Sequence, residues 1–247
     1  MKMKSLKFLG MVMAIFMAFS ISLSSCLDHN DAESQYISLV TVEHLLGGTV
    51  YIPDESPKTV LLPQNGAANL ANAKRAIITY SVPELTNTDN TTQIPITLLA
   101  GSEEYPVYEV TNRLDTIADY TSAFTGFSKY SVSMFQFMEV NVVRDRFLNV
   151  GFSYIADELG KTCMAPNHVS NDTIYLDFLL KKKGDSRSSG TGMNCYDLSN
   201  LRYNSLIDYS KLQPKKDSIC VTVTLKATTG IYDDKTTTDS RTVRISY

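Results

Sequence analysis

The sequence predicts a mainly β protein with two domains, and its composition and a change of pattern along the chain are the reasons. Tyrosine is abundant, with 14 residues, tryptophan is absent, and Val, Ile, Thr and Tyr recur in short alternating runs. Such residues fit the pleated, half-buried surface of a strand. The region 119–133 is only weakly periodic, and the spacing of the strand-like runs changes after it. We therefore expect one domain at residues 36–118 and a second at residues 119–247.

Residues 1–25 have the pattern of a bacterial export signal. Three lysines precede an uncharged apolar run, Phe8 to Phe19, which is too short to span a bilayer comfortably. The run leads into Leu-Ser-Ser-Cys26, which resembles the bacterial lipobox, where the cysteine receives a diacylglycerol before cleavage. We predict that Cys26 is the lipid attachment site. An ordinary secretory signal with an incidental cysteine is the alternative.

Residues 26–35 are polar and acidic, and we interpret them as a tether between lipid and fold. The stretch resembles the surface-export signal of some Bacteroidetes lipoproteins, although a merely hydrophilic tether would have the same composition. The sequence thus predicts an outer-membrane lipoprotein of the cell envelope, facing either the periplasm or the cell surface.

The first domain has the pattern of an OB-like five-stranded barrel. A short helical turn is expected at residues 67–73, before the fourth strand, and the Asn- and Thr-rich run 86–93 would join the fourth strand to the fifth. Five strands with a small helix before the fourth is an OB-like count. The five expected strands are Tyr36–His44, Thr49–Ile52, Lys58–Leu62, Arg75–Val82 and Ile94–Ala100.

The second domain has the pattern of an antiparallel β-sandwich. Its strand-like runs are short and are separated by long polar connections, as in sandwiches with antiparallel strands. The expected strands are Phe135–Val143, Phe147–Ile155, Thr173–Leu180, Met193–Leu198, Ser218–Thr228 and Thr242–Tyr247.

Taken together, these features resemble the NigD-like lipoproteins of Bacteroides and its relatives. The lipobox cysteine is followed by Leu27-Asp28, and the run Arg-Phe-Leu-Asn-Val-Gly-Phe at residues 146–152 resembles the strand that opens the family's C-terminal sandwich. Tyr-Asp-Leu-Ser-Asn-Leu at residues 196–201 is similar to a later family segment. The resemblance implies an OB-like domain followed by a sandwich, with no established enzymatic chemistry. The chain departs from the family at Val50-Tyr51-Ile52, where tryptophan is missing.

Charge and motifs exclude several classes of function. The chain has 23 basic and 26 acidic side chains; the export signal contains three of the lysines and no acid, which leaves 20 against 26, a net charge of −6. Nucleic acid is therefore not an expected partner. There is no Gly-x-Ser-x-Gly motif, and the three histidines, at 29, 44 and 168, are scattered without metal-ligand spacing. We expect no catalytic residues, no metal site and no cofactor.

With Cys26 lipidated, three cysteines remain, so at most one disulfide can form within the chain. Cys195 and Cys220 both lie in strand-like runs and are the favoured pair. Buried free thiols, which pack as small hydrophobes, are the alternative.

Three tripeptides resemble the Asp-Ser/Thr-apolar acceptor for O-glycosylation of exported proteins in Bacteroidetes. They begin at Asp115, Asp172 and Asp217. An acid before a β-branched residue is also a common way for a strand to begin. The candidate acceptor hydroxyls are Thr116, Thr173 and Ser218.

We predict that the protein is a non-catalytic binding or interaction module. OB-like barrels bind ligands on one face and its loops, and the partner would be a glycan or another envelope protein. The alternative is a structural or protective envelope protein with an immunity-like role toward a protein partner. The candidate ligand-contact aromatics are Tyr51, Tyr80, Tyr105 and Tyr108, for which packing inside the fold is the competing interpretation.

Overall fold

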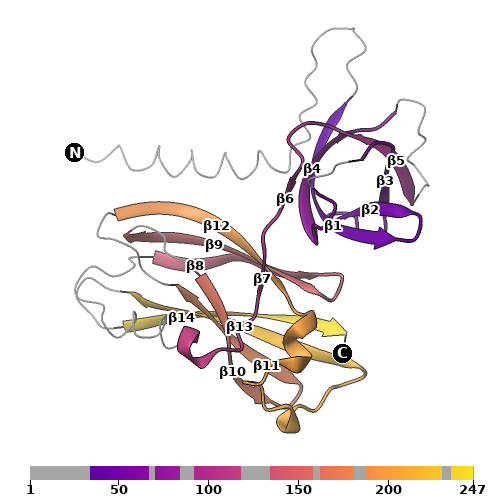
Figure 1. The fold of residues 1–247 in the computed structure, drawn as a ribbon. Helices are drawn as coiled ribbons and strands as arrows, with labels where there is room; N and C mark the ends of the chain where they lie inside the picture. The colour runs from indigo at the N-terminus through magenta and orange to yellow at the C-terminus, as the bar shows by residue number, and fades with distance from the viewer. Residues whose placement is uncertain are drawn as a thin grey trace, which may run out of the picture. The chain divides into compact units, whose positions relative to one another are not determined.

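The computed structural model of the protein describes residues 34–66, 70–83, 92–117, 134–157, 162–180, 187–229 and 235–246. The chain divides into two compact units, Met1–Tyr105 and Pro106–Tyr247, which are described separately (Figure 1). The predicted signal peptide, Cys26 and most of the tether lie outside the described residues. Among the residues that are described, no helix has the length and apolar character needed to cross a membrane.

The first unit is a closed five-stranded barrel (Figure 1). Its strands are β1 (Gln35–Leu45), β2 (Gly48–Pro53), β3 (Val60–Pro63), β4 (Arg75–Ser81) and β5 (Gln93–Leu98). The barrel closes because β1 pairs with β4 along its first half and with β2 along its second half, while β5 joins β3 to β4. A two-residue strand, β6 (Glu103–Glu104), is added beside β4. The predicted OB-like barrel is confirmed.

Successive side chains of each barrel strand point alternately into and out of the barrel, and the inward-pointing ones fill its interior. Val40 and Val42 of β1 and Ala76 and Ile78 of β4 are buried in one apolar cluster. Leu70, from the expected helical turn, is also part of this cluster, so the segment before β4 contributes to the barrel core. Residues 67–69 of that turn and most of the run 86–93 lie outside the described residues.

A charged pair is also buried in the barrel. The Arg75 side chain is 0% exposed, and its guanidinium donates to both carboxylate oxygens of Asp54, at 2.6 and 2.5 Å. It also donates to Thr41 Oγ at 2.9 Å. Two parallel hydrogen bonds of this kind are the strongest arrangement open to an arginine and a carboxylate.

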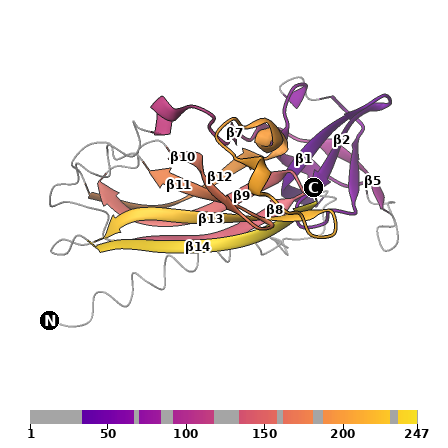
Figure 2. The ribbon, with the colours of Figure 1, turned by 90° about the horizontal axis from the view of Figure 1, so that it is seen from below.

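The second unit is a sandwich of two four-stranded sheets (Figures 1 and 2). One sheet has the order β10-β11-β13-β14, and the other has the order β7-β12-β9-β8. The strand bounds of the first sheet are β10 Thr162–Ser170, β11 Thr173–Leu180, β13 Ser218–Thr229 and β14 Lys235–Ser246. Those of the second are β7 Val107–Glu109, β8 Met134–Val143, β9 Phe147–Asp157 and β12 Arg187–Asp197. A single apolar core, with Phe152 and Phe178 in contact, lies between the sheets.

The sandwich differs from the expectation in its pairing. It is mixed rather than purely antiparallel, since β11 pairs with β13 and β7 with β12 in parallel. The chain leaves the first sheet after β11, forms β12 in the other sheet and returns as β13, so β11 and β13 run in the same direction. β10 was not predicted, and a bulge between Pro166 and His168 interrupts its alternation.

The units divide between Tyr105 and Pro106, whereas the sequence placed the boundary after residue 118. The cause is β7, which pairs with β12 of the sandwich through Val107, Tyr108 and Glu109. A three-residue strand carries too little pattern to reveal which domain it joins.

Candidate functional site

Two of the four predicted contact tyrosines are buried. Tyr51 and Tyr80 are 2% and 8% exposed and belong to the core cluster of the barrel, where burial raises the pKa of both phenols. The prediction that they are exposed contacts is wrong, because their strands turn these side chains toward the barrel interior. Tyr105 is half-buried. Tyr108 is exposed, with its ring centroid 5.9 Å from that of Tyr196, and its role as a ligand contact stays a prediction.

The predicted Cys195–Cys220 disulfide is not formed. Cys163, Cys195 and Cys220 are all free thiols. Cys195 lies in β12 and Cys220 in β13, which belong to different sheets. Each is next to a residue of the core between the sheets, Tyr196 or Ile219, so alternation places its own side chain on the other face of its sheet. A disulfide needs the two Cβ atoms within about 4.5 Å of each other.

The three candidate glycosylation hydroxyls are all half-buried. Thr116 lies in a single helical turn at residues 114–117. Thr173 opens β11, and its hydroxyl donates to Asp172. Ser218 opens β13, and its hydroxyl donates to the carbonyl of Lys215 at 2.8 Å. The last two tripeptides therefore begin strands, and glycosylation of any of the three stays a prediction.

These two strand starts lie side by side. The Cys220 amide donates to the Asp172 carbonyl at 2.8 Å, and Lys215 forms an ion pair with the Asp172 carboxylate at 3.3 Å. Desolvation opposes ionisation of Asp172, but hydrogen bonds from Lys215 and Thr173 outweigh it and lower the pKa of this carboxyl. Asp172 thus stabilises the beginning of the β11–β13 pair.

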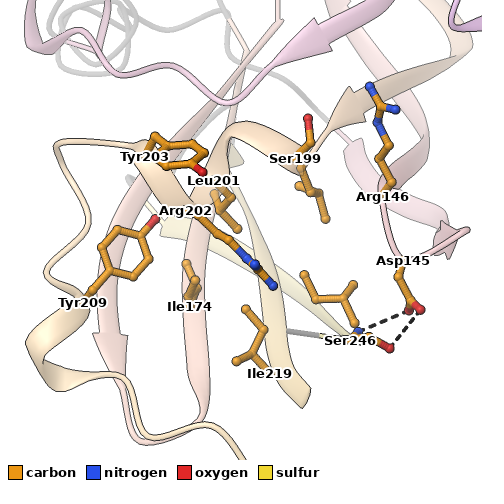
Figure 3. Close-up of a pocket in the computed structure, with 12 residues that line it drawn as sticks. Asp145, Arg146, Ile174, Ser199, Leu201, Arg202, Tyr203, Tyr209, Ile219 and Ser246 are labelled. Atoms are coloured by element: carbon orange, nitrogen blue, oxygen red, sulfur yellow. Dashed lines mark hydrogen bonds between the residues drawn. The ribbon is translucent and has the colours of Figure 1, made fainter. Parts of the chain in front are cut away.

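A pocket of about 310 Å³ lies at the end of the sandwich where these strands begin (Figure 3). Its floor is aliphatic and includes Ile174 of β11, Ile219 of β13 and Ile245 of β14. Its rim is polar and combines the turn between β8 and β9 with the connection that follows β12. The rim residues are Asp145, Arg146, Ser199, Arg202, Tyr203, Tyr209 and Ser246.

The connection between β12 and β13 forms one wall of the pocket. It contains two short 3-10 helices, η2 (Ser199–Tyr203) and η3 (Tyr209–Lys211). Leu201 and Ile207 anchor it in the sandwich core. Twenty residues is unusually long for a connection inside a compact domain, and connections of this length are commonly functional.

One buried amide orders the middle of this connection. Asn204 donates from Nδ2 to the carbonyl of Thr111 at 2.9 Å and to that of Val110 at 3.4 Å. Its Oδ1 accepts from the Leu206 amide at 3.0 Å. The wall is therefore fixed by the fold before any ligand binds, which reduces the entropic cost of binding.

The first charged group of the rim is engaged by a buried carboxylate. Arg146 donates from Nε and from a terminal nitrogen to the two oxygens of Asp197, at 3.0 and 2.8 Å. The Asp197 side chain is 0% exposed, and its Oδ1 also accepts from the Ser199 amide at 3.0 Å. This pair joins the β8–β9 turn to the start of the pocket wall.

The second charged group, Asp145, is held by the end of β14. Its carboxylate accepts from the Ser246 amide at 3.2 Å and from the Ser246 hydroxyl at 2.9 Å (Figure 3). Asp145 adopts a positive φ of 51°, as does Arg144 with 57°, so the turn is tight and directs the next residue, Arg146, to Asp197.

The remaining polar groups are Arg202, Tyr203 and Tyr209. Figure 3 shows the Arg202 side chain reaching across the pocket toward Ile219 and Ser246, while the two tyrosine rings stand on the opposite side. Tyr203 is 85% exposed. Sequence reasoning did not single out these three residues. The signal that could have found them was the long polar connection after residue 198, which separates two predicted strands.

The pocket can hold a polar ligand against an apolar floor. In the described part of the chain, no three His, Cys, Asp or Glu side chains gather in a way that could hold a metal ion.

Comparison with solved structures finds a likeness in fold to one protein from Bacteroides fragilis. No family model matches the chain, and no curated protein matches it either. A crystal structure described as a "Putative lipoprotein" from Bacteroides fragilis is 16% identical, with a TM-score of 0.51, covering 86% of this chain and 98% of that one.

Two further crystal structures have lower scores. A protein of unknown function from Bacteroides vulgatus is 16% identical, with a TM-score of 0.45, covering 86% of this chain and 90% of the other. A NigD-like immunity protein from Bacteroides caccae is 12% identical, with a TM-score of 0.45, covering 86% and 94%. The resemblance to Bacteroides lipoproteins predicted from the sequence is confirmed at the level of the fold, by the likeness to the B. fragilis protein.

Proposed function

We propose that the protein is a lipoprotein of the cell envelope, held at the outer membrane by lipid on Cys26 and facing the periplasm or the cell surface. The lipobox-like run that ends at Cys26 supports this proposal, as does the fold shared with the B. fragilis protein. Several acyl chains, each buried methylene contributing about 0.8 kcal/mol, would give durable attachment.

Replacing the attachment residue tests the anchor. Cys26→Ser should shift the protein from the membrane fraction to the soluble fraction of the native host, and metabolic labelling with a fatty acid should be lost. Cys163→Ser is the matched control, because it removes a buried thiol from the sandwich and should leave both readouts unchanged. Unchanged membrane association of Cys26→Ser would refute the anchor.

For the body of the protein we propose a non-catalytic binding module, with the pocket of the sandwich as its ligand site. The observation that carries this proposal is the pocket itself: about 310 Å³, aliphatic at the floor and polar at the rim, with a wall already fixed by Asn204. Ligand sites commonly combine such a concave apolar surface with a few placed polar groups, and this volume lies at the lower end of their range.

A binding screen with a pocket variant tests this function. The purified protein would be screened against glycan arrays and small-molecule libraries, in parallel with Tyr203→Ala, which removes an exposed wall of the pocket. A ligand of the pocket should bind the variant at least fivefold more weakly. Tyr36→Ala is the comparison, since it removes another exposed tyrosine that does not line the pocket. Equal binding to wild type and Tyr203→Ala would contradict the pocket as the site.

The second candidate is a structural or protective envelope protein with an immunity-like protein partner. The observation that favours it is in the barrel: Leu45 and Leu46, at the turn between β1 and β2, are both strongly exposed. Exposed apolar side chains at a loop tip are typical of a protein contact. Crosslinking in the native host followed by pulldown should then yield one stable partner whose capture is lost in Leu46→Ser. Negative results in all ligand screens together with such a partner would favour this candidate over the pocket.

A further inference from the structure

The two units of the chain carry very different charge. Between the predicted signal peptide and the end of the first unit, residues 26–105 include three basic and ten acidic side chains, a net charge of −7. The second unit, residues 106–247, includes 17 basic and 16 acidic side chains, a net charge of +1. The excess of acid is therefore confined to the tether and the barrel, and the electrostatic field of this unit favours a partner of positive charge.

Apolar side chains are exposed on one face of this acidic unit. Ile37 of β1 is 68% exposed. Leu39 of β1 lies opposite Ile77 of β4, which lies opposite Glu103 of β6. Directly opposed residues of antiparallel strands project from the same face of a sheet, and alternation along β1 places Ile37 on that face with Leu39. Because Val40 belongs to the barrel core, this is the outer face.

These four residues combine an apolar strip with a carboxylate at its edge. Leu39 and Ile77 are half-buried, while Glu103 is exposed. We call the surface formed by Ile37, Leu39, Ile77 and Glu103 the Ile37 face. An exposed apolar strip bordered by charge is typical of a site of protein interaction.

Charge decides among the possible occupants of the Ile37 face. A nucleic acid or an anionic lipid surface carries the same sign of charge as this unit and would be repelled. The tether of the chain itself is disfavoured for the same reason, since it contains Asp28, Asp31 and Glu33. A two-fold contact between two copies of the face would bring two acidic units together. A segment of another protein with apolar side chains next to lysine or arginine complements both the strip and the carboxylate.

We propose that the Ile37 face docks a basic segment of another protein, with apolar side chains of the partner on Ile37, Leu39 and Ile77 and a lysine or arginine at Glu103. This proposal rests on the second of the proposed functions, a role toward a protein partner, and does not involve the pocket. Exposed ion pairs contribute little to affinity. The apolar contact therefore supplies most of the affinity, while the charges speed the encounter and reject acidic partners.

Matched peptides test the chemistry of the partner. Two amphipathic helical peptides of about 14 residues have the same leucine face, with lysines on the polar face of one and glutamates on that of the other. The lysine peptide should bind the purified protein, and its affinity should fall about tenfold as the NaCl concentration rises from about 50 to about 300 mM. The glutamate peptide should not bind. Equal binding of the two peptides, or no binding of the lysine peptide, would overturn the proposal.

Variants with matched controls locate the contact. Ile37→Ser and Glu103→Gln should each weaken binding of the lysine peptide about fivefold. Leu114→Ser is the control for the first, because it removes an apolar side chain that is 70% exposed in the second unit. Asp217→Asn is the control for the second: it removes the same charge from an exposed position of the second unit, where asparagine tolerates the positive φ of 58°. Urea unfolding checks that all four variants are folded. Equal weakening by variants and controls would overturn the Ile37 face as the contact.

Further outcomes separate this inference from the other occupants and from the proposed function. Binding to phosphatidylcholine vesicles that is lost in Ile37→Ser would indicate a membrane, and a dimer in sedimentation that dissociates in Ile37→Ser would indicate a second copy; either result would overturn the proposal. Crosslinking in the native host distinguishes the two contacts on β1. A protein whose capture is lost in Leu46→Ser but kept in Ile37→Ser would overturn the Ile37 face and keep the proposed role toward a protein partner.

Discussion

The barrel and the sandwich each contain an arginine bound through two hydrogen bonds to an aspartate, and the two pairs bury opposite partners. In the barrel the Arg75 side chain is 0% exposed and that of Asp54 is 17% exposed. In the sandwich the Asp197 side chain is 0% exposed and that of Arg146 is 43% exposed. Each partially exposed group covers a charge that the core has taken out of water.

The difference shows which charges serve the fold and which can serve a ligand. A buried ion whose partner is removed is strongly destabilising, because nothing replaces the water it has lost. Asp54 and Arg146 are therefore structural, although both reach the surface. Arg146 lies on the rim of the pocket, but its two hydrogen bonds to Asp197 commit it to the fold.

The largest effect is expected in the barrel. Asp54→Ala removes the carboxylate from the buried Arg75 guanidinium and should reduce the free energy of unfolding by about 3–5 kcal/mol, as measured by urea unfolding. The double variant Asp54→Ala with Arg75→Met should recover much of this loss, since it also removes the buried charge. A loss below about 1 kcal/mol in Asp54→Ala would show that the buried cation does not need this partner.

A smaller loss is expected for the sandwich. Arg146→Ala leaves the buried Asp197 carboxylate, which still accepts from the Ser199 amide, so we expect a loss of about 2–3 kcal/mol. Urea unfolding of the two variants under identical conditions gives the ranking. If Arg146→Ala were as costly as Asp54→Ala, burial of the charge that remains, and not the hydrogen bonds that it keeps, would determine the loss.

The ion pair between Asp172 and Lys215 allows the contribution of a partly buried carboxylate to stability to be tested by changing the pH. Desolvation opposes ionisation of Asp172, but hydrogen bonds from Lys215 and Thr173 outweigh it, so the pKa of Asp172 is lower in the folded protein than its ordinary value of 3.8. The carboxylate therefore stabilises the fold above pH 3.8, and this contribution is lost as the pH falls through the folded-state pKa. Wild-type stability should decline below pH 4. Asp172→Asn should decline less steeply, as followed by urea midpoints at pH 7, 4 and 3. If the urea midpoints of the wild type and Asp172→Asn fell equally with pH, other carboxyl groups would be responsible for the acid sensitivity.

The smallest effect is expected for the exposed pair Arg113–Asp115, whose side chains are 69% and 65% exposed. Arg113→Gln should leave the urea midpoint unchanged at neutral pH, because water replaces the lost partner. A measurable loss of stability in Arg113→Gln would show that the exposure of an ion pair does not determine how much it contributes to the free energy of unfolding.

The reactivity of the cysteine thiols tests whether a disulfide also stabilises the sandwich. In the part of the chain that is described, all cysteines lie in the sandwich, so we expect no cross-link to supplement its ion pairs. Burial raises the pKa of Cys163 to about 11, so in the native protein at pH 8 a thiol reagent should label Cys220 first and Cys163 slowly. In urea without reductant, all three thiols should react. Fewer than three would reveal a disulfide.

Much of the fold follows from local pattern. The barrel strands alternate between core and exterior, and the short segment before β4 contributes Leu70 to the core. β10 was missed because Pro166 and the bulge beside it break the alternation on which strand prediction depends. The parallel β11–β13 pairing was missed for another reason: it depends on β12 lying in the opposite sheet, which no local window contains.

The candidate site is formed by contacts between residues far apart in the sequence, so it was harder to predict from the sequence than the strands were. Tyr51 resembles an exposed strand aromatic in the sequence, but closure of the barrel buries it. Cys195 and Cys220 both lie in strands, as expected, but in different sheets. The pocket exists only because the connection after β12 meets the isoleucines of three other strands.

The long first strand also has a mechanical consequence. β1 begins at Gln35, the last residue of the predicted tether, and is paired with β4 over seven positions, of which the last two also pair with β2. A force on the chain ahead of Gln35 would be transmitted first to β1, and the strand could leave the barrel only if its hydrogen bonds to β4 and β2 were broken. The last of the seven, Thr41 with Arg75, lies at the buried ion pair with Asp54, so the strand that follows the predicted anchor is tied to the barrel by a charged pair as well as by its backbone.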